Sequence, residues 1–547
     1  MLAAIIDEMP IVMMLNLKKR YSLLVIVLLS VVFVKAQKQP DCKVDIRYNK
    51  DQVGASAMTE IIAPIVAPFK MPQLQRPVFA DYKISISDKG AKPGDKVTVV
   101  IQQLIDDVSK RGGGTVVVSA GKWHTGRISL KSDVNLEIAD GASLYFSGEV
   151  EDYRPAVFTR NEGIEVMSLG ACIYANGARN IAVTGKGKLI GPAKGGSVRK
   201  QIMTKDVIEN VVNYKTPVAE RIYEGHNGDF IFPPMFISPI NCSNVLIEGV
   251  SLENTAFWNI VPVYCDSVII RGVIVNSVGI ARGDGIDVES SRNVLIEYTT
   301  LSSGDDCFTI KAGRGDDGLR VGIPTENVVV RYCLALEGHG GITCGSETAA
   351  MIRNLYVHDC VFENTRTAIR FKTRRPRGGG GENLYYERIK IAGGRYALEW
   401  DMLGSAAHVG TMAARYPLRE KNHLTPVFRN ITASDIEIEN MEYFMKASSI
   451  PESPLSNVLL KNVKSTTKQL MIATDIDGFE IKNGYFKTDS SVIDLLDVRN
   501  FKFNKVYFDN KQQSVEVKVE GDLSDNIEFK KTFPKKPDGW NKAKFRK

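Results

Sequence analysis

Long hydrophobic runs are scarce in this 547-residue chain, and so are cysteines. An apolar run from Leu23 to Val34 has twelve residues, whereas a helix needs about 20 to cross a bilayer. Eight cysteines are too few for a disulfide scaffold at this length. No recognised nucleic-acid-binding motif is present. These absences argue against stable membrane insertion, a disulfide-stabilised module and a nucleic acid partner.

The composition is that of an ordinary soluble globular protein. Apolar residues make up 44% of the chain and charged residues 24%. The net charge of +7 and the pI of about 8.7 fit an acidic polymer as partner. Length alone would suggest several domains, but a solenoid lengthens by adding repeats, so a chain of this length can form a single domain.

A phrase of Asn or Ser followed by alternating aliphatic residues recurs along the chain. Its clearest copies start 23, 26, 34 and 27 residues apart, at Asn244, Ser267, Asn293, Asn327 and Asn354. Fainter copies start at Asn180, Asn430, Asn457 and Asn500. A period of 20 to 50 residues indicates a solenoid, and short β-branched runs bounded by Gly, Asn and Asp indicate strands. The apolar spacing of helical repeats is absent, so the sequence predicts a parallel β-helix.

Cysteines occupy matching places in neighbouring repeats. Cys242 and Cys265 each come two residues before an anchor, and Cys333 and Cys360 each come six residues after one. Equivalent residues should therefore lie over one another in adjacent coils. Stacked buried thiols and disulfides explain the pattern equally well.

Three parts of the chain are distinguished. Residues 1–36 have the features of an export signal: Lys18 to Arg20, then the apolar run, then small residues ending at Ala36. Residues 37–80 form a lead segment, and 81–547 form the β-helix. Within it, Val97 to Val108 has helical apolar spacing and predicts a helix that caps the open end of the solenoid; Gly112 to Val118 predicts a first strand. The basic tail from Lys530 to Lys547 is expected to be solvated.

Polar residues with catalytic potential fall at nearly the same place in successive repeats. Counted from the preceding anchor, Asp284 lies 17 residues on, Asp305 and Asp306 lie 12 and 13 on, and His339 lies 12 on. Arg370 and Lys372 follow at 16 and 18. Adjacent strands are about 4.8 Å apart, so these side chains should gather on one side of the solenoid.

The cluster suits acid–base hydrolysis of a glycosidic bond. Three neighbouring carboxylates repel one another, so at least one should retain its proton to a higher pH than a free Asp. Successive strand residues point in opposite directions, and we expect a turn or bulge at Gly304 to bring both Asp305 and Asp306 to the surface. Taken singly, Asp-Asp after Gly is typical of a turn, and Arg370 to Arg377 is typical of a solvated charged loop.

From Tyr82 to Ser465 the sequence resembles glycoside hydrolase family 28, the polygalacturonases. The resemblance rests on the motifs around Gly185, Asn254 to Trp258, Gly283 to Asp287, Gly304 to Lys311, Gly338 to Gly340 and Arg370 to Lys372. It implies a right-handed, single-stranded parallel β-helix of the pectin lyase-like kind. It also implies that Asp305 is the general acid, that Asp284 and Asp306 activate water, that His339 supports the acid, and that Arg370 and Lys372 bind the sugar. Such enzymes invert the anomeric centre and need no metal or other cofactor.

The chain departs from the family pattern at one position of the cluster. Arg282 stands where the family has Asn, so we expect it to bind another substrate carboxylate or a branched sugar. The insertion from Arg314 to Pro324 resembles bacterial members, which are often exo-acting. The sequence therefore predicts an exported, periplasmic or secreted monomer that cleaves α-galacturonosyl bonds in acidic pectic polysaccharide. Rhamnogalacturonan or another branched pectin is the alternative substrate.

Two other functions stay open at this stage. A pectate lyase-type β-eliminase would use a calcium ion, for which Asp316 and Asp317 are candidate ligands. A non-catalytic glycan-binding β-helix would usually display aromatic residues, and the chain has only four tryptophans.

Overall fold

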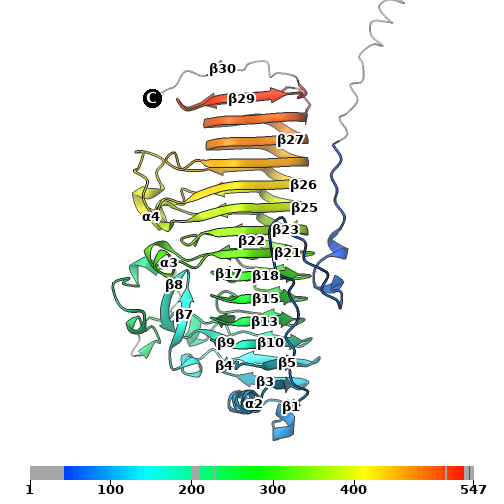
Figure 1. The fold of residues 1–547 in the computed structure, drawn as a ribbon, viewed down its shortest axis with the longest axis vertical. Helices are drawn as coiled ribbons and strands as arrows, with labels where there is room; N and C mark the ends of the chain where they lie inside the picture. The colour runs from blue at the N-terminus through cyan, green and yellow to red at the C-terminus, as the bar shows by residue number, and fades with distance from the viewer. Residues whose placement is uncertain (1–41, 200–207, 227–229, 512–513, 535–540, 543–547) are drawn as a thin grey trace, which may run out of the picture. The chain divides into compact units, whose positions relative to one another are not determined.

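The computed structural model describes residues 42–199, 208–226, 230–511, 514–534 and 541–542, which form one unit starting at Cys42. Within it, strands wind into the stacked coils of a parallel β-helix (Figure 1). The predicted fold is confirmed. The expected export signal at 1–36 lies outside the described residues. No helix among the described residues has both the length and the apolar character needed to cross a membrane.

Each coil contributes strands to three parallel faces. The first face contains β1 (Lys83–Ser85), β2 (Gly114–Val118), β5 (Val134–Ile138), β10 (Arg179–Gly185), β13 (Ser243–Glu248), β15 (Asp266–Arg271), β18 (Arg292–Glu297), β21 (Thr325–Arg331) and β23 (Ile352–Glu363). The second contains β3 (Gly121–Thr125), β6 (Ala142–Phe146), β11 (Lys188–Ile190), β14 (Ser251–Glu253), β16 (Ile274–Asn276), β19 (Thr300–Ser302) and the start of β22 (Leu334–Cys344).

The third face positions the candidate site. It contains β4 (Ile128–Ser129), β9 (Ala171–Asn176), β12 (Met235–Ile240), β17 (Ile286–Glu289), β20 (Phe308–Lys311), the end of β22 and β24 (Thr365–Lys372). Later strands run through more than one face: β25 (Gly380–Asp401), β26 (Val427–Ser448) and β27 (Leu455–Asp509), followed by β28 (Glu516–Glu520), β29 (Asp525–Lys530) and β30 (Asn541–Lys542).

Short elements cap or branch from the coils. Helix α2 (Thr98–Lys110) buries Ile101, Leu104, Ile105 and Val108 at the first coils, as its spacing predicts. An antiparallel hairpin, β7 (Val157–Asn161) and β8 (Ile164–Ser168), and helices α3 (Gly315–Val321) and α4 (Ala406–Val409) lie on one side of the coils (Figure 1). Single 3₁₀ turns are found at 50–52, 55–57, 86–89, 150–153, 197–199, 208–210, 218–220, 375–377 and 410–413.

The repeat anchors occupy the corner at which each first-face strand begins. Asn244, Asn293, Asn327 and Asn354 all have φ near +55°, a left-handed conformation that Asn tolerates better than most residues. Their amides also bond from coil to coil: the Asn327 Nδ2 donates to Asn293 at 3.2 Å, and the Asn354 Nδ2 donates to Asn327 at 3.0 Å. The phrase recurs because each anchor satisfies the corner geometry and a ladder of hydrogen bonds together.

Replacing Asn327 with Ala should lower the free energy of unfolding by about 2–3 kcal/mol. The change removes two amide hydrogen bonds, each worth about 1 kcal/mol, and leaves a Cβ residue at φ +56° without local bonding. Urea unfolding measures the loss. The Asn327→Gly variant should lose about 1 kcal/mol less than the Asn327→Ala variant, because Gly tolerates this φ. Equal losses in the two variants would show that backbone strain at residue 327 does not contribute.

The interior is filled by aligned apolar residues and free thiols. In the first face Val245, Val268, Val294 and Val328 fall in register through successive coils and are buried. All eight cysteines are free, and seven are buried. The stacking of Cys242 with Cys265 is confirmed by a hydrogen bond between their side chains, so the disulfide alternative is wrong here.

The lead segment is packed along the first face as an extended strap, residues 42–80. Ile65 and Leu74 cover an outward-facing apolar stripe made by Ala182, Leu246, Ile269, Leu295, Val329 and Tyr356. Buried arginines of the coils hold the strap's backbone: Arg271 donates to the Thr59 carbonyl at 2.6 Å and Arg331 to the Ala63 carbonyl at 2.7 Å. The strap thus removes from water a face that the coils alone would expose.

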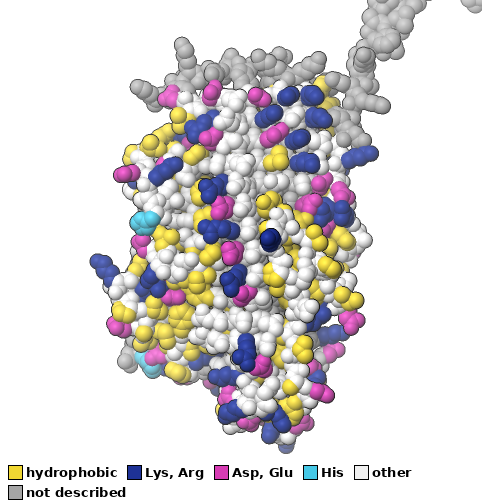
Figure 2. Space-filling view, in the orientation of Figure 1, with side chains coloured by type: hydrophobic (Ala, Val, Ile, Leu, Met, Phe, Trp, Pro, Cys, Tyr) yellow, Lys and Arg dark blue, Asp and Glu magenta, His cyan; other side chains and the backbone are white. Residues whose placement is uncertain are grey.

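Exposed charges are mixed in sign over the coils (Figure 2). On neighbouring coils, Glu382 pairs with Arg353 at 2.9 Å and with Arg429 at 2.7 Å, and Glu437 pairs with Lys464 at 2.8 Å. Such exposed pairs stabilise little individually. At the upper right of Figure 2, over the later coils, Lys and Arg side chains gather with few acidic groups among them, whereas charges of both signs alternate over the rest of the view.

Candidate active site

Strand register brings the predicted residues together on the third face. Ile286 pairs with Phe308, and Phe308 pairs with Ile342, so Asp284 comes level with Asp306, and Asp305 with His339. Backbone bonds continue this alignment: the Gly285 N–H donates to the Asp306 carbonyl at 2.9 Å, and the His339 N–H to the Asp305 carbonyl at 2.8 Å. Thr343 pairs with Arg370 on the next coil. Residues up to 88 positions apart therefore share one site.

Asp284, Asp305 and Asp306 form a trio whose carboxylate oxygens lie within 4.8 Å of one another. Asp284 is 3% exposed, and burial, followed by repulsion from Asp287 and Asp305, raises its pKa well above the usual range. Asp305 is the most accessible of the three, with a side chain 27% exposed. The trio therefore retains a proton at a pH where free aspartates have lost theirs.

Asp306 differs from the other two because cations surround it. It is fully buried, and its carboxylate accepts from the Lys372 Nζ at 2.6 Å and the Arg370 Nη1 at 3.3 Å. Burial alone would raise its pKa, but Lys372 and Arg370 outweigh that effect and hold the pKa well below its usual range. Asp306 is thus an ionised carboxylate even in mildly acidic solution.

His339 lies on β22 beside the accessible acid. Its Nδ1 is 3.2 Å from the Asp305 Oδ1, and half of its side chain is exposed. The hydrogen bond with Asp305 raises the pKa of His339, although burial opposes the shift. Protonated His339 can therefore donate a charge-assisted hydrogen bond to Asp305 and fix the orientation of its carboxyl group.

A buried charged layer supports the trio from below. The Lys311 Nζ lies 3.0 Å from Glu347, 3.5 Å from Asp287 and 4.5 Å from the centre of the Trp258 ring. Asp287 is fully buried, neither of its oxygens is hydrogen-bonded within the described residues, and burial raises its pKa to about 8. Lys311 is the cation nearest to this carboxyl, and it keeps positive potential under the site.

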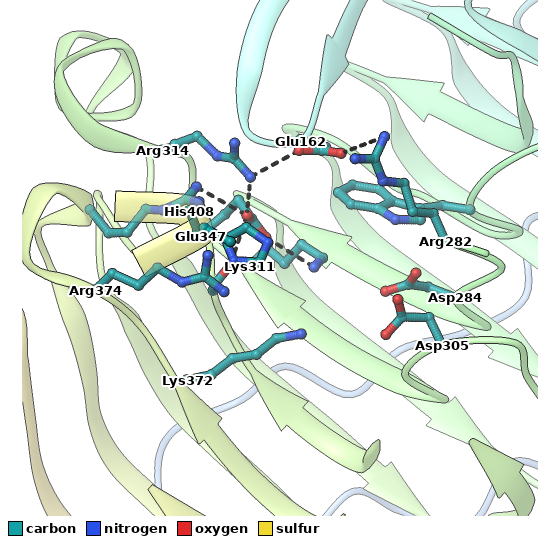
Figure 3. Close-up of a pocket in the computed structure, with 14 residues that line it drawn as sticks. Glu162, Arg282, Asp284, Asp305, Lys311, Arg314, Glu347, Lys372, Arg374 and His408 are labelled. Atoms are coloured by element: carbon teal, nitrogen blue, oxygen red, sulfur yellow. Dashed lines mark hydrogen bonds and ion pairs between the residues drawn. The ribbon is translucent and has the colours of Figure 1, made fainter. Parts of the chain in front are cut away.

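The trio opens into a pocket of about 470 Å³ (Figure 3). Its lining includes Glu162, Trp258, Arg282, Asp284, Asp305, Lys311, Arg314, Ser346, Glu347, Lys372, Arg374, Arg377, Ala407 and His408. Figure 3 shows the two aspartates on one side, with Arg374 and His408 across from them. Six lining residues are cationic and four are acidic, so the pocket favours an anionic ligand.

A chain of ion pairs runs along the pocket from Arg282, beside Asp284, to Arg314 and Glu347 on the other side (Figure 3). Glu162, in the turn between β7 and β8, pairs with Arg282 at 3.3 Å and with Arg314 at 3.0 Å. Glu347 pairs with Arg314 at 2.7 Å and with Arg377 at 3.2 Å. These bridges join the hairpin, the segment before α3 and the turn after β24 into one charged wall (Figure 3).

Comparison with known proteins accounts for this combination of fold and site. Residues 224–402 match the profile of Glycosyl hydrolases family 28. The chain is 28% identical to the exopolygalacturonase of Thermotoga maritima, with a TM-score of 0.68 over 76% of this chain and 93% of that one. The chain belongs to glycosyl hydrolase family 28.

Curated relatives of this family 28 protein extend beyond the matched segment. A probable polygalacturonase of Vitis vinifera is 25% identical over 72% of this chain and 77% of its own length. An exo-poly-alpha-D-galacturonosidase of Dickeya chrysanthemi is 24% identical over 73% of this chain and 70% of its own length. The enzyme class, a glycoside hydrolase, follows from the family.

One expectation from the sequence is wrong in this family 28 site. Asp306 does not reach the surface, because Lys372 and Arg370 provide its partners inside the protein. The chain does bend at Gly304, where a Cβ would lie 2.1 Å from the Ile280 carbonyl oxygen, so glycine permits close packing at the bend. The alternative interpretation of Arg370 to Arg377 as a solvated charged loop is excluded, since Arg375 and Arg377 are buried in ion pairs.

The structure adds residues that the sequence did not single out. Glu162, Glu347 and His408 line the pocket without belonging to any motif. Lys311 ends the motif that starts at Gly304, and Trp258 ends the motif that starts at Asn254. Their place in these family motifs is the feature of the sequence that could have identified them as pocket residues. Arg282 does line the pocket as expected, but it is paired with Glu162.

The aspartate trio is spaced closely enough to share a cation. However, Lys372 and Arg370 already bond to the carboxylate of Asp306. The candidate calcium ligand Asp317 is likewise engaged, 2.9 Å from Arg221. At Asp306 and at Asp317, neighbouring cationic side chains thus neutralise the negative charge that would attract a metal cation.

Proposed function

We propose that the protein hydrolyses α-galacturonosyl bonds of pectic polysaccharide, removing units from a chain end. The observation that carries the proposal is the aspartate trio at one side of a cationic pocket that ion-paired arginines border. Acidic groups of the substrate match the pocket charge. The names of the relatives, which include a polygalacturonase and an exo-acting galacturonosidase, support the same substrate.

In this proposal Asp305 is the general acid. It is the most accessible of the trio, and transfer of its proton to the glycosidic oxygen allows the bond to break. A water molecule loses a proton to Asp306, or to Asp284 once that group is ionised, and its oxygen attacks the anomeric carbon. The proton that the base gains balances the one that Asp305 gives to the leaving oxygen, and exchange with solvent restores both groups. Asp306, held ionised by Lys372 and Arg370, is the stronger candidate base at acidic pH.

Arg370, Lys372 and Arg282 are the proposed sugar-binding residues. Lys372 lines the pocket and has N–H groups beyond the one given to Asp306. Arg282, bridged to Glu162, would hold a substrate carboxylate only in competition with that glutamate.

Incubation with oligogalacturonides tests the proposal. Hydrolysis by single displacement should release reducing ends with inverted configuration and without new absorbance in the near ultraviolet. The trio is more compact than the roughly 6.5–9.5 Å usual between acid and base in inverting enzymes, so the product anomer is the informative readout. An absorbance increase would indicate a lyase, and no product from pectic, rhamnogalacturonan or branched substrates would refute an enzymatic role on pectin.

The pH profile should depend on His339. Its raised pKa means that it is protonated below that pKa and loses its charge as the pH rises through it, so its support of Asp305 disappears on the alkaline side. Replacing His339 with Gln should lower kcat/KM about 10-fold or more near the optimum and remove that alkaline decline. A variant with an unchanged pH profile would contradict the role.

Export and domain organisation belong to the same proposal. A polymer outside the cell requires an exported enzyme, and the basic and apolar residues of 1–36 support a cleaved signal, with the strap and catalytic β-helix remaining. N-terminal sequencing of the mature protein, expected to start at Gln37, tests this part.

A further inference from the structure

Arg374 differs from the other arginines around the pocket. Arg282, Arg314, Arg375 and Arg377 each form an ion pair with a glutamate. Among the described residues, the guanidinium of Arg374 has no ion pair or hydrogen bond, and its Nε is buried without a partner. It points into the pocket, on the side opposite Asp284 and Asp305 (Figure 3).

The position of Arg374 is built into the fold. Its backbone lies between β24 and a turn that is fixed by the buried ion pairs of Arg375 and Arg377. Its aliphatic stem packs directly on Gly404, where a Cβ would lie 2.9 Å from the Arg374 Cδ. Gly404 therefore leaves room for the stem, and the guanidinium is presented to the pocket in a defined place.

An unpaired guanidinium in this setting is costly. Burial lowers the pKa of Arg374, with Arg314 among the cations that add to the shift. The glutamates that could neutralise it, Glu162 and Glu347, are already shared among Arg282, Arg314, Lys311 and Arg377. A planar, fork-shaped donor group aimed into a cavity matches a carboxylate, which it can bind through two parallel hydrogen bonds.

We propose that Arg374 binds the carboxylate of the terminal sugar unit, on the side of the pocket opposite Asp284 and Asp305, and makes a free acid group on that unit a requirement for cleavage. The inference rests on the proposed function, since it names the group recognised at the same site. Arg374 is separated from the trio by the pocket, so it selects the substrate without taking part in proton transfer.

Matched oligogalacturonides test this selection. One set has all carboxyl groups free; two others have a single methyl ester, on the non-reducing or on the reducing terminal unit. The protein should cleave the free acid with a kcat/KM about 10-fold to 100-fold above that for one of the two esters, because the ester loses the charge-assisted bonds. The affected ester identifies which end enters the pocket.

Replacing Arg374 with Gln should abolish this discrimination. Activity on the free acid should fall by the same factor, while activity on the discriminated ester stays nearly unchanged, and Arg374→Lys should recover part of the difference. Arg395→Gln is the control, because Arg395 is an exposed, paired arginine on β25 and its loss should change nothing.

The outcomes separate this inference from the function itself. Equal loss on acid and ester, or discrimination that persists in Arg374→Gln, would overturn the role of Arg374 while leaving hydrolysis intact. If the unaltered protein cleaves none of the oligomers, the proposed function fails first. Binding of free acid and ester oligomers to an Asp305→Asn, Arg374→Gln double variant, measured by calorimetry against Asp305→Asn alone, gives the same comparison without turnover.

Discussion

Replacing Asp305 with Asn should lower kcat/KM on oligogalacturonides by about 10³-fold or more and leave the fold intact. General acid catalysis contributes roughly 10²–10⁴-fold, and an amide cannot protonate the leaving oxygen. The side chain is partly exposed and its neighbour His339 lies 3.2 Å away. Asn occupies the same volume, so the free energy of unfolding should change by less than about 1 kcal/mol.

Asp140→Asn provides the matched control for Asp305→Asn. Asp140 is an exposed residue between β5 and β6, far along the chain from the site. Reducing-end release and urea unfolding should both be unaltered in this variant. Full activity in Asp305→Asn would show that the acid is another group, and Asp284, whose pKa is raised by burial, would then be the next to test.

The fold was predictable because each coil repeats the same local requirement. An Asn at a left-handed corner followed by alternating aliphatics predicts a strand start and a buried face, and Asn293 and Asn327 show both. Register then follows from the anchors, which is why Asp284 and the Asp305–Asp306 pair could be aligned before the structure was known.

The remaining parts of the site depend on contacts that no periodicity encodes. Glu162 reaches Arg282 across 120 residues of sequence from a hairpin that lies outside the repeat. The burial of Asp306 follows from cations on a later coil. The strap covers an outward apolar stripe whose residues look like ordinary strand positions in the sequence. Long-range pairing of this kind is decided by tertiary packing, which a local pattern cannot express.

Lys372→Met should lower kcat/KM by about 10²–10³-fold, with the larger loss at acidic pH. Met keeps the length of the side chain but removes the charge 2.6 Å from Asp306, leaving Arg370 at 3.3 Å as its nearest cation. Because burial alone raises the pKa of Asp306 and Lys372 is the first cause that lowers it, the pKa must rise in the variant. The ionised base is then lost as pH falls through that higher pKa.

The measurement is the dependence of kcat/KM on pH between about 3 and 8. Lys372→Arg, which keeps the charge, should retain the acid limb near its original position. Lys390→Met, on the neighbouring strand β25 and away from the pocket, should match the unaltered protein. A loss in Lys372→Met that is equal at every pH would mean that Lys372 acts by binding substrate alone. A loss that grows as the pH falls would show that Lys372 keeps Asp306 ionised beside Asp284, whose pKa is raised, so that the site holds a base and a protonated carboxyl together.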